Sequence, residues 1–173
     1  MTGEGSPHPD GGGGARRAWV FGDDVDTDAI VPGRYLRGEI EDIVPHVMEG
    51  IRPAFVHEVR QGDVIVGGRN FGTGSSRELA VVALQRSGIE AVIAVSFARI
   101  FFRNCINSGL LAVECRDATR IRERDRVAIS VESGTIRIEG AGEELAFLPI
   151  PADIKIIVDC GGLEQYVACV GRD

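Results

Sequence analysis

The fold is decided by residues 63–113, which read DVIVGGRNFGTGSSRELAVVALQRSGIEAVIAVSFARIFFRNCINSGLLAV. Short apolar runs alternate here with segments of helical pattern, and glycine stands at several of the joins. Fully apolar runs of this length are typical of strands buried on both faces of a parallel sheet. We therefore expect parallel βαβ units of an α/β protein, with strands over 63–66, 91–95 and 110–113 and helices over 76–86 and 99–107.

The flanking segments extend this pattern on both sides. Toward the N-terminus, we expect a strand over 18–21, an acidic loop over 22–28, and a short helix over 39–48 that Pro45 limits. After residue 113 the pattern changes, because apolar and polar residues alternate as they do in half-buried strands joined by hairpin turns. The expected elements are strands over 126–131, 135–139 and 144–148 and short helices over 152–158 and 163–170.

Composition limits the class of protein. The chain has 173 residues, a formal charge of −7 and 44% hydrophobic residues, which suits one globular domain. A net acidic chain is a poor candidate for binding nucleic acid through its phosphates. No apolar run approaches the ~20 residues of a transmembrane helix, and the N-terminal segment does not resemble a secretory signal. We expect a cytoplasmic protein that binds neither nucleic acid nor membrane.

The N-terminal segment, the cysteines and the histidines contribute no recognisable site. Residues 1–16 are rich in glycine and lack apolar periodicity, so we predict a disordered tail ahead of a single domain over 17–173. His46 and His57 belong to no motif and are interpreted as solvated or structural residues. The cysteines have no spacing typical of a metal site, so we expect reduced thiols and no metal bound by this chain alone; they are Cys105, Cys115, Cys160 and Cys169.

The glycine-rich loop before the helix predicted over 76–86 is the candidate functional site. Residues 72–78 read GTGSSRE, which matches neither a dinucleotide-binding fingerprint nor a P-loop. The glycines allow a ligand close to the backbone, and a helix N-terminus offers free N–H groups and positive potential. Ser75 and Glu78 fit a capping box. Arg77 opposes the helix dipole, which suggests that it binds a carboxylate or phosphate; the alternative is a helix cap with a surface arginine.

Three ordered motifs resemble a known family. The segment NFGTGSSRE (residues 70–78) resembles a signature of the swivel domain of the aconitase superfamily. The segment SFARIFFRNCINSGL (residues 96–110) resembles isopropylmalate dehydratase small subunits, and so does DVDTD (residues 24–28) followed by PGRYL (residues 32–36). The resemblance extends from about Trp19 to Val170, the length of a stand-alone small subunit. It implies a swivelling β/β/α domain, in which a mixed sheet is flanked by helices.

The resemblance also implies an activity and a partner. The family dehydrates and rehydrates hydroxy-di- or tricarboxylic acids, and the interconversion of 2-isopropylmalate and 3-isopropylmalate is the expected reaction. In the family a [4Fe–4S] cluster is held by a large subunit. The chain is therefore expected to be an inactive hydro-lyase subunit until it joins such a large subunit, in a heterodimer or a heterotetramer.

Roles for individual residues follow from the same resemblance. Ser75 matches the base that removes the proton next to a substrate carboxylate, and Arg77 matches the carboxylate-binding arginine. Ser76 and Gly74 are expected to bind substrate beside them. The supporting residues are expected to be Thr27, Asp28 and Asn70, and for Asp28 a turn-capping aspartate is the alternative.

Two positions bear on the substrate. Leu79 stands where the family usually has His or Gln, which removes a polar group near the site. Arg37 follows Tyr35 and Leu36 in a specificity loop that tends to be apolar in isopropylmalate enzymes and has an arginine in homoaconitases. We predict that Arg37 binds a further substrate carboxylate, since an unpaired arginine beside an isopropyl group would be costly; the alternative is that it faces solvent.

Three other functions stay open at this point. One is a homoaconitase or a related small subunit acting on a more acidic hydroxy acid through Arg37. The second is a regulatory or assembly subunit without catalytic residues. The third is a free-standing module that binds phosphate or carboxylate.

Overall fold

The structure is a computed structural model that describes residues 14–170. Its longest helix has 10 residues, and within the described part of the chain no helix is long and apolar enough to cross a bilayer. In chain order the elements are β1 (Arg16–Val20), α1 (Thr27–Ile30), η1 (Gly33–Tyr35), α2 (Ile40–Ile43), η2 (Val44–His46), α3 (Phe55–Glu58), β2 (Asp63–Gly67), α4 (Glu78–Arg86), β3 (Ile89–Ala94), α5 (Arg99–Ser108), β4 (Leu111–Glu114), η3 (Ala118–Arg120), β5 (Arg126–Ser130), β6 (Thr135–Ile138), β7 (Glu143–Ala146), α6 (Ala152–Asp159) and α7 (Leu163–Val170), where η marks a 3₁₀ helix.

The strands form one mixed sheet of seven strands in the order β4-β3-β2-β1-β5-β6-β7. Strands β1 to β4 are parallel, and their register places Trp19 opposite Ile65 and Ile65 opposite Val92. Strand β5 pairs antiparallel with the start of β1, and β6 and β7 continue as antiparallel neighbours. The predicted mixed sheet with flanking helices is confirmed.

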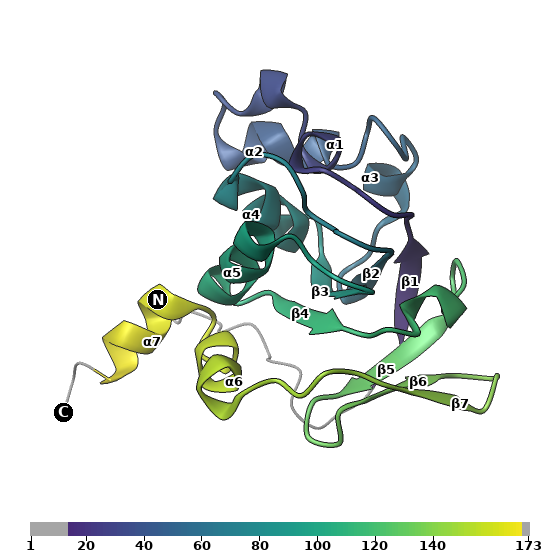
Figure 1. Cartoon of the computed structure of the whole chain (residues 1–173). Coiled ribbons are helices and arrows are strands. Elements are labelled where there is room, and N and C mark those ends of the chain that lie inside the picture. The colour runs from purple at the N-terminus through teal and green to yellow at the C-terminus, as the bar shows by residue number, and fades with distance from the viewer. Residues whose placement is uncertain (1–13, 171–173) are drawn as a thin grey trace.

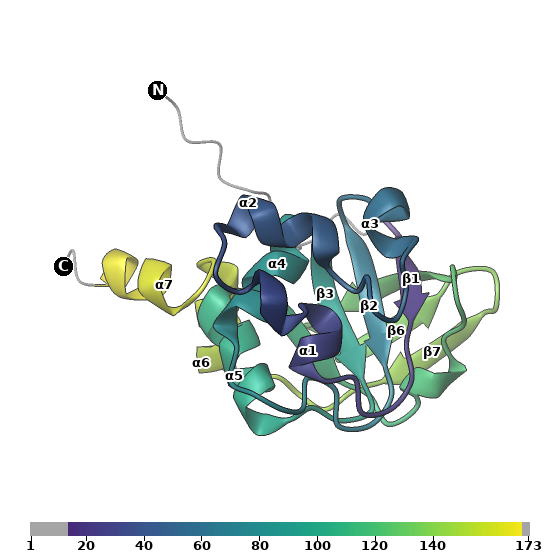
Figure 2. The same cartoon turned by 90° about the horizontal axis from the view of Figure 1, so that it is seen from above.

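The sheet separates two hydrophobic cores. On one face, α4 and α5 cover the parallel strands, and alternate strand residues such as Ile65 and Val92 point into this core. On the other face, the residues in between, such as Val64 and Ile93, pack against β5 to β7 and Val158 of α6. The antiparallel strands thus lie beneath the parallel ones, with the helices above (Figure 1). Seen from above, α1 and α2 lie next to α4, with β3, β2 and β1 side by side to their right (Figure 2).

The elements predicted from the sequence are present, with differences at their ends and in the N-terminal third. Residues 1–13 of the tail predicted over 1–16 lie outside the described residues. The predicted end of the tail is one residue too late, because β1 begins at Arg16. Arg16 pairs with Val127 of β5, and its Nε is 2.7 Å from Oε2 of Glu90. The helix predicted over 39–48 divides into α2 and η2, since Pro45 cannot donate the hydrogen bond that would continue it.

Gly72 sets how closely the loop after β2 packs on α5. Its φ is +81°, a left-handed conformation, and a Cβ at this position would overlap the ring of Phe101. Its N–H also donates to the carbonyl of Val25 at 2.7 Å. Any side chain at Gly72 would therefore both strain the backbone and push the loop away from α5.

Gly72→Ala is expected to destabilise the domain by about 3 kcal/mol or more, the sum of left-handed strain and overpacking. The measurement is the free energy of unfolding in denaturant. Gly142→Ala is the matched control, because Gly142 also has positive φ (+66°) but no atom within 4 Å of an added Cβ. The control should cost only about 1–2 kcal/mol. Equal losses in the two variants would show that the contact with Phe101 is unimportant.

Candidate functional site

The candidate site is built where two segments distant in sequence lie side by side. The segment after β1 and the segment after β2 leave neighbouring parallel strands at the same edge of the sheet. Backbone hydrogen bonds join them along their length: Gly68 N to Gly22 O at 3.0 Å, Asp24 N to Arg69 O at 2.8 Å, Gly72 N to Val25 O at 2.7 Å and Thr27 N to Thr73 O at 2.9 Å. These main-chain hydrogen bonds therefore hold the glycine-rich loop against the segment after β1.

Thr27 fixes the backbone of Ser75, the first of the two serines in this loop. Its side chain is buried, and its Oγ1 donates to the carbonyl of Ser75 at 3.1 Å. Gly74, Ser75 and Ser76 are all exposed. No hydrogen bond within residues 14–170 engages the hydroxyl of Ser75 or Ser76. Two hydroxyls are thus presented to solvent on an ordered backbone.

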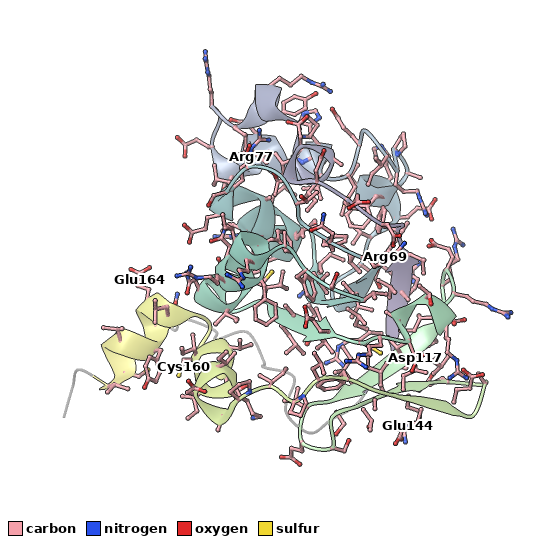
Figure 3. The ribbon with its side chains drawn as sticks, in the orientation of Figure 1. Arg69, Arg77, Asp117, Glu144, Cys160 and Glu164 are labelled. Carbon is pink, nitrogen blue, oxygen red and sulfur yellow. The ribbon has the colours of Figure 1, made fainter. Side chains whose placement is uncertain are left out.

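Arg77 is held beside these serines by Asp28. Its Nη1 donates to Oδ1 of Asp28 at 3.0 Å and to the carbonyl of Val31 at 3.3 Å. The same Asp28 oxygen accepts the N–H of Gly33 at 2.9 Å. The Arg77 side chain is only 21% exposed, whereas that of Asp28 is 63% exposed. Figure 3 shows Arg77 at the upper end of α4, next to the segment of α1 and α2.

The contacts of Asp28 keep its carboxylate ionised. The hydrogen bond from Arg77, followed by that from the Gly33 N–H, lowers the pKa of Asp28 below its ordinary value of 3.8. Because the folded pKa is lowered, the contribution of this pair is present above that ordinary value and is lost as pH falls through the lower, folded one. Asp28 is thus more than a turn-capping residue: it orients the arginine.

The helix after the serines begins differently from the prediction. α4 starts at Glu78, its N-cap residue is Arg77, and no side chain caps it. The capping box predicted for Ser75 and Glu78 is therefore wrong, because Thr27 and the main-chain bonds of the loop already place Ser75 outside the helix. An uncapped start leaves the first N–H groups of α4 available to an anion. Leu79, in this first turn, is 39% exposed.

The two remaining predicted residues, Asn70 and Arg37, lie at the margins of this arrangement. Asn70 has a φ of +56°, and its Nδ2 donates to Oδ1 of Asp24 at 2.9 Å. It therefore braces the loop pair rather than facing the serines. Arg37 is exposed in the turn after η1, and within residues 14–170 its guanidinium has no ion-pair partner. Its charge is thus available to a ligand.

A cluster of four side chains beside this turn was missed by the sequence analysis. The rings of Tyr35 and His46 are stacked, with centroids 3.6 Å apart and planes 4° apart. The guanidinium of Arg34 also lies over the ring of Tyr35, 4.7 Å from its centroid. Glu49 accepts from Nδ1 of His46 at 2.6 Å and from Nη2 of Arg34. The histidine hydrogen bond is the main reason that the pKa of Glu49 is lowered. The spacing of His46 and Glu49 is the one sequence signal for this cluster.

The cysteines do not gather into a ligand set in the described residues. Cys105 and Cys115 are buried, and burial raises the pKa of both thiols. Cys160 is half-buried and Cys169 is exposed. Within residues 14–170, no group of three or more His, Cys, Asp or Glu side chains is placed to bind a metal ion. The residues that the structure describes therefore offer no set of ligands for an iron–sulfur cluster.

Known proteins resemble this chain over most of its length. A family model of the aconitase C-terminal domain matches residues 45–118. The 3-isopropylmalate dehydratase small subunit 1 of Archaeoglobus fulgidus is 50% identical over 151 residues, 87% of this chain and 94% of that protein. The methanogen homoaconitase small subunit of Methanothermobacter thermautotrophicus is 52% identical over 152 residues, 87% of this chain and 88% of that protein.

A solved structure agrees with these relatives. The crystal structure of a 3-isopropylmalate dehydratase from Methanocaldococcus jannaschii matches with a TM-score of 0.86 and 44% identity, and the match covers 90% of this chain and 93% of that one. The shared fold and the extent of sequence identity lead to one conclusion. The chain belongs to the family of 3-isopropylmalate dehydratase small subunits, within the aconitase superfamily.

Proposed function

We propose that this chain is the small subunit of a heteromeric hydro-lyase that interconverts 2-isopropylmalate and 3-isopropylmalate. One observation supports this most strongly: Arg77 is fixed by Asp28 beside two exposed serines at an uncapped helix N-terminus. Such an arrangement suits a hydroxy acid with a carboxylate next to the carbon that loses a proton. The relative in Archaeoglobus, which is named a 3-isopropylmalate dehydratase small subunit, supports the same assignment.

Arg77 would bind the substrate carboxylate. Both of its hydrogen bonds to protein use Nη1, which leaves Nε and Nη2 without a partner in residues 14–170. These two N–H groups lie on one edge of the guanidinium and match the two oxygens of a carboxylate. Asp28 keeps this edge in one orientation, so less freedom is lost when substrate binds.

Ser75 would act as the base. Its alkoxide takes the proton from the carbon next to the bound carboxylate, and the electron pair of that C–H bond moves into the carboxylate to form an aci-carboxylate. The same electrons then expel the hydroxyl from the neighbouring carbon, which leaves a double bond. Water adds back to this bond with the positions of H and OH exchanged, which completes the isomerisation. The helix N-terminus and Arg77 supply positive potential, which stabilises the charge on Ser75 and on the aci-carboxylate.

A large subunit would complete the site. Gly74, Ser75 and Ser76 are exposed, so substrate bound here would be open to water without a second protein surface. We propose that the partner holds a [4Fe–4S] cluster, which serves as the Lewis acid for the departing hydroxyl. The assembly would be a heterodimer or heterotetramer in the cytoplasm, and this chain alone would be inactive.

A homoaconitase-type reaction is the second candidate. It is favoured by Arg37, an exposed arginine with no ion-pair partner in the described residues. A substrate with a third carboxylate would satisfy this charge, whereas an isopropyl group would not. The homoaconitase small subunit of Methanothermobacter, at 52% identity, is compatible with this candidate.

Ser75→Ala should lower kcat of the reconstituted two-subunit enzyme by at least ~10³-fold, since a positioned base contributes about 10²–10⁴. The measurement is the rate of isopropylmalate dehydration, monitored by the ultraviolet absorbance of the unsaturated product. Ser133→Ala, in the distant turn between β5 and β6, is the matched control and should retain full activity. Activity within threefold of the unaltered enzyme in Ser75→Ala would instead favour a regulatory or assembly subunit.

Arg37→Val distinguishes the two substrates. We expect kcat/KM for homocitrate to fall at least ~10-fold, because one substrate carboxylate loses its partner, while kcat/KM for isopropylmalate changes by less than about threefold. Arg86→Val, at the far end of α4, is the matched control. Equal effects of Arg37→Val on both substrates would show that Arg37 does not bind a substrate carboxylate.

A further inference from the structure

The turn that contains Arg37 is exposed at its tip, whereas Leu36 before it is half-buried and packs against the core. Arg37, Gly38 and Glu39 are all exposed. Three main-chain hydrogen bonds shape the turn, in which Tyr35 N donates to Pro32 O at 3.0 Å, Leu36 N to Gly33 O at 3.3 Å and Gly38 N to Tyr35 O at 3.1 Å. Such isolated turns are marginal in water, so the position of Arg37 depends on what anchors the turn at its two ends.

One anchor leads back to the candidate site. Gly33, the first residue of η1, donates its N–H to the Asp28 oxygen that also binds Arg77. A Cβ at Gly33 would lie 3.1 Å from that oxygen and 3.6 Å from Nη2 of Arg77. The start of the turn is thus in close contact with the carboxylate-binding arginine.

The second anchor is the stack of Tyr35 on His46. Parallel rings with centroids 3.6 Å apart leave little freedom for Tyr35, and the guanidinium of Arg34 also lies over its ring. Glu49 joins Arg34 and His46 through hydrogen bonds. All four side chains therefore restrain each other on one side of the turn.

The support beneath the stack is rigid. Val47 and Met48, which follow His46, are fully buried in the core shared with α4 and α5. The N–H of Met48 donates to the carbonyl of Ile30, at the end of α1, at 2.8 Å. His46 is only 33% exposed at its side chain, and Glu49 is 24% exposed. The stack thus connects the exposed turn to the core.

We propose that the stacked pair Tyr35 and His46, held by Arg34 and Glu49, is a positioning device that fixes the turn of Leu36 to Glu39 and so places Arg37 to select the substrate. This inference rests on the second candidate of the proposed function in one respect, namely that Arg37 contacts a substrate carboxylate. The four residues act through Arg37 and through the shape of the turn, and none of them is assigned contact with the reacting atoms.

The first experiment tests the turn without substrate or partner. Amide hydrogen exchange is measured by NMR for Tyr35, Leu36 and Gly38 in the full chain. His46→Ala should accelerate exchange at these amides at least tenfold, because the stack no longer holds the turn. His46→Phe, which keeps a flat ring, should restore slow exchange, and His57→Ala, an exposed histidine on α3, should leave it unchanged. Unchanged exchange in His46→Ala would overturn the proposal.

The second experiment tests selectivity in the enzyme reconstituted with its large subunit. His46→Ala should lower kcat/KM for homocitrate at least tenfold relative to isopropylmalate, His46→Phe should remain within threefold of the unaltered enzyme, and His57→Ala should match it. A general loss of stability would lower kcat/KM for both substrates by the same factor, and that result would overturn the proposal.

The Arg37→Val variant, assayed in parallel, separates the two ideas. If it changes the ratio of kcat/KM for the two substrates and His46→Ala does not, the positioning device is overturned and the contact between Arg37 and substrate stands. If Arg37→Val leaves the ratio unchanged, the contact between Arg37 and substrate fails, and the selectivity part of this inference is overturned with it, while the exchange rates still decide whether the stack holds the turn.

Discussion

Main-chain hydrogen bonds between the segments after β1 and β2 are the constraint on which the site depends. The two strands are parallel neighbours, so both segments leave the sheet at the same edge. Four bonds, from Gly68 to Thr27, then hold them side by side. Without this pairing, the serines would lie on a free glycine-rich loop. With it, the backbone of Ser75 is fixed before any ligand is present, which is what an effective catalytic base requires.

Asp28 joins this paired loop to the rest of the site. One of its carboxylate oxygens accepts from Arg77, which follows the serines, and from Gly33, which begins η1. A single acidic residue therefore fixes the arginine that would bind the common carboxylate and the turn that would distinguish substrates. The stack of Tyr35 on His46 holds the same turn from its other side. The turn is thus held at one end by Asp28, which also holds Arg77 beside Ser75, and on its other side by the stack, which does not involve Asp28.

The parts of the fold with strong sequence periodicity could be predicted. Strands β2 to β4 are buried apolar runs, α4 and α5 have helical patterns, and Gly109 ends α5 with a φ of +75° as expected of a helix-ending glycine. Ser75 and Arg77 were placed by a motif rather than by periodicity, and the structure brings them together with Asp28. The capping box failed because local sequence does not reveal that Thr27 holds the loop from a distant segment. The stacking of Tyr35 on His46 could not be predicted either, since contact between residues on either side of α2 depends on tertiary packing and leaves no local sequence pattern.

In the proposed enzyme, this chain supplies the base and the carboxylate-binding arginine to a site that a second subunit completes. A crystal structure of the assembled two-subunit enzyme with a bound hydroxy acid tests it most directly. We expect a substrate carboxylate on Nε and Nη2 of Arg77, with Oγ of Ser75 about 3 Å from the carbon that loses its proton. A substrate bound away from Arg77, with Ser75 still facing solvent, would contradict it.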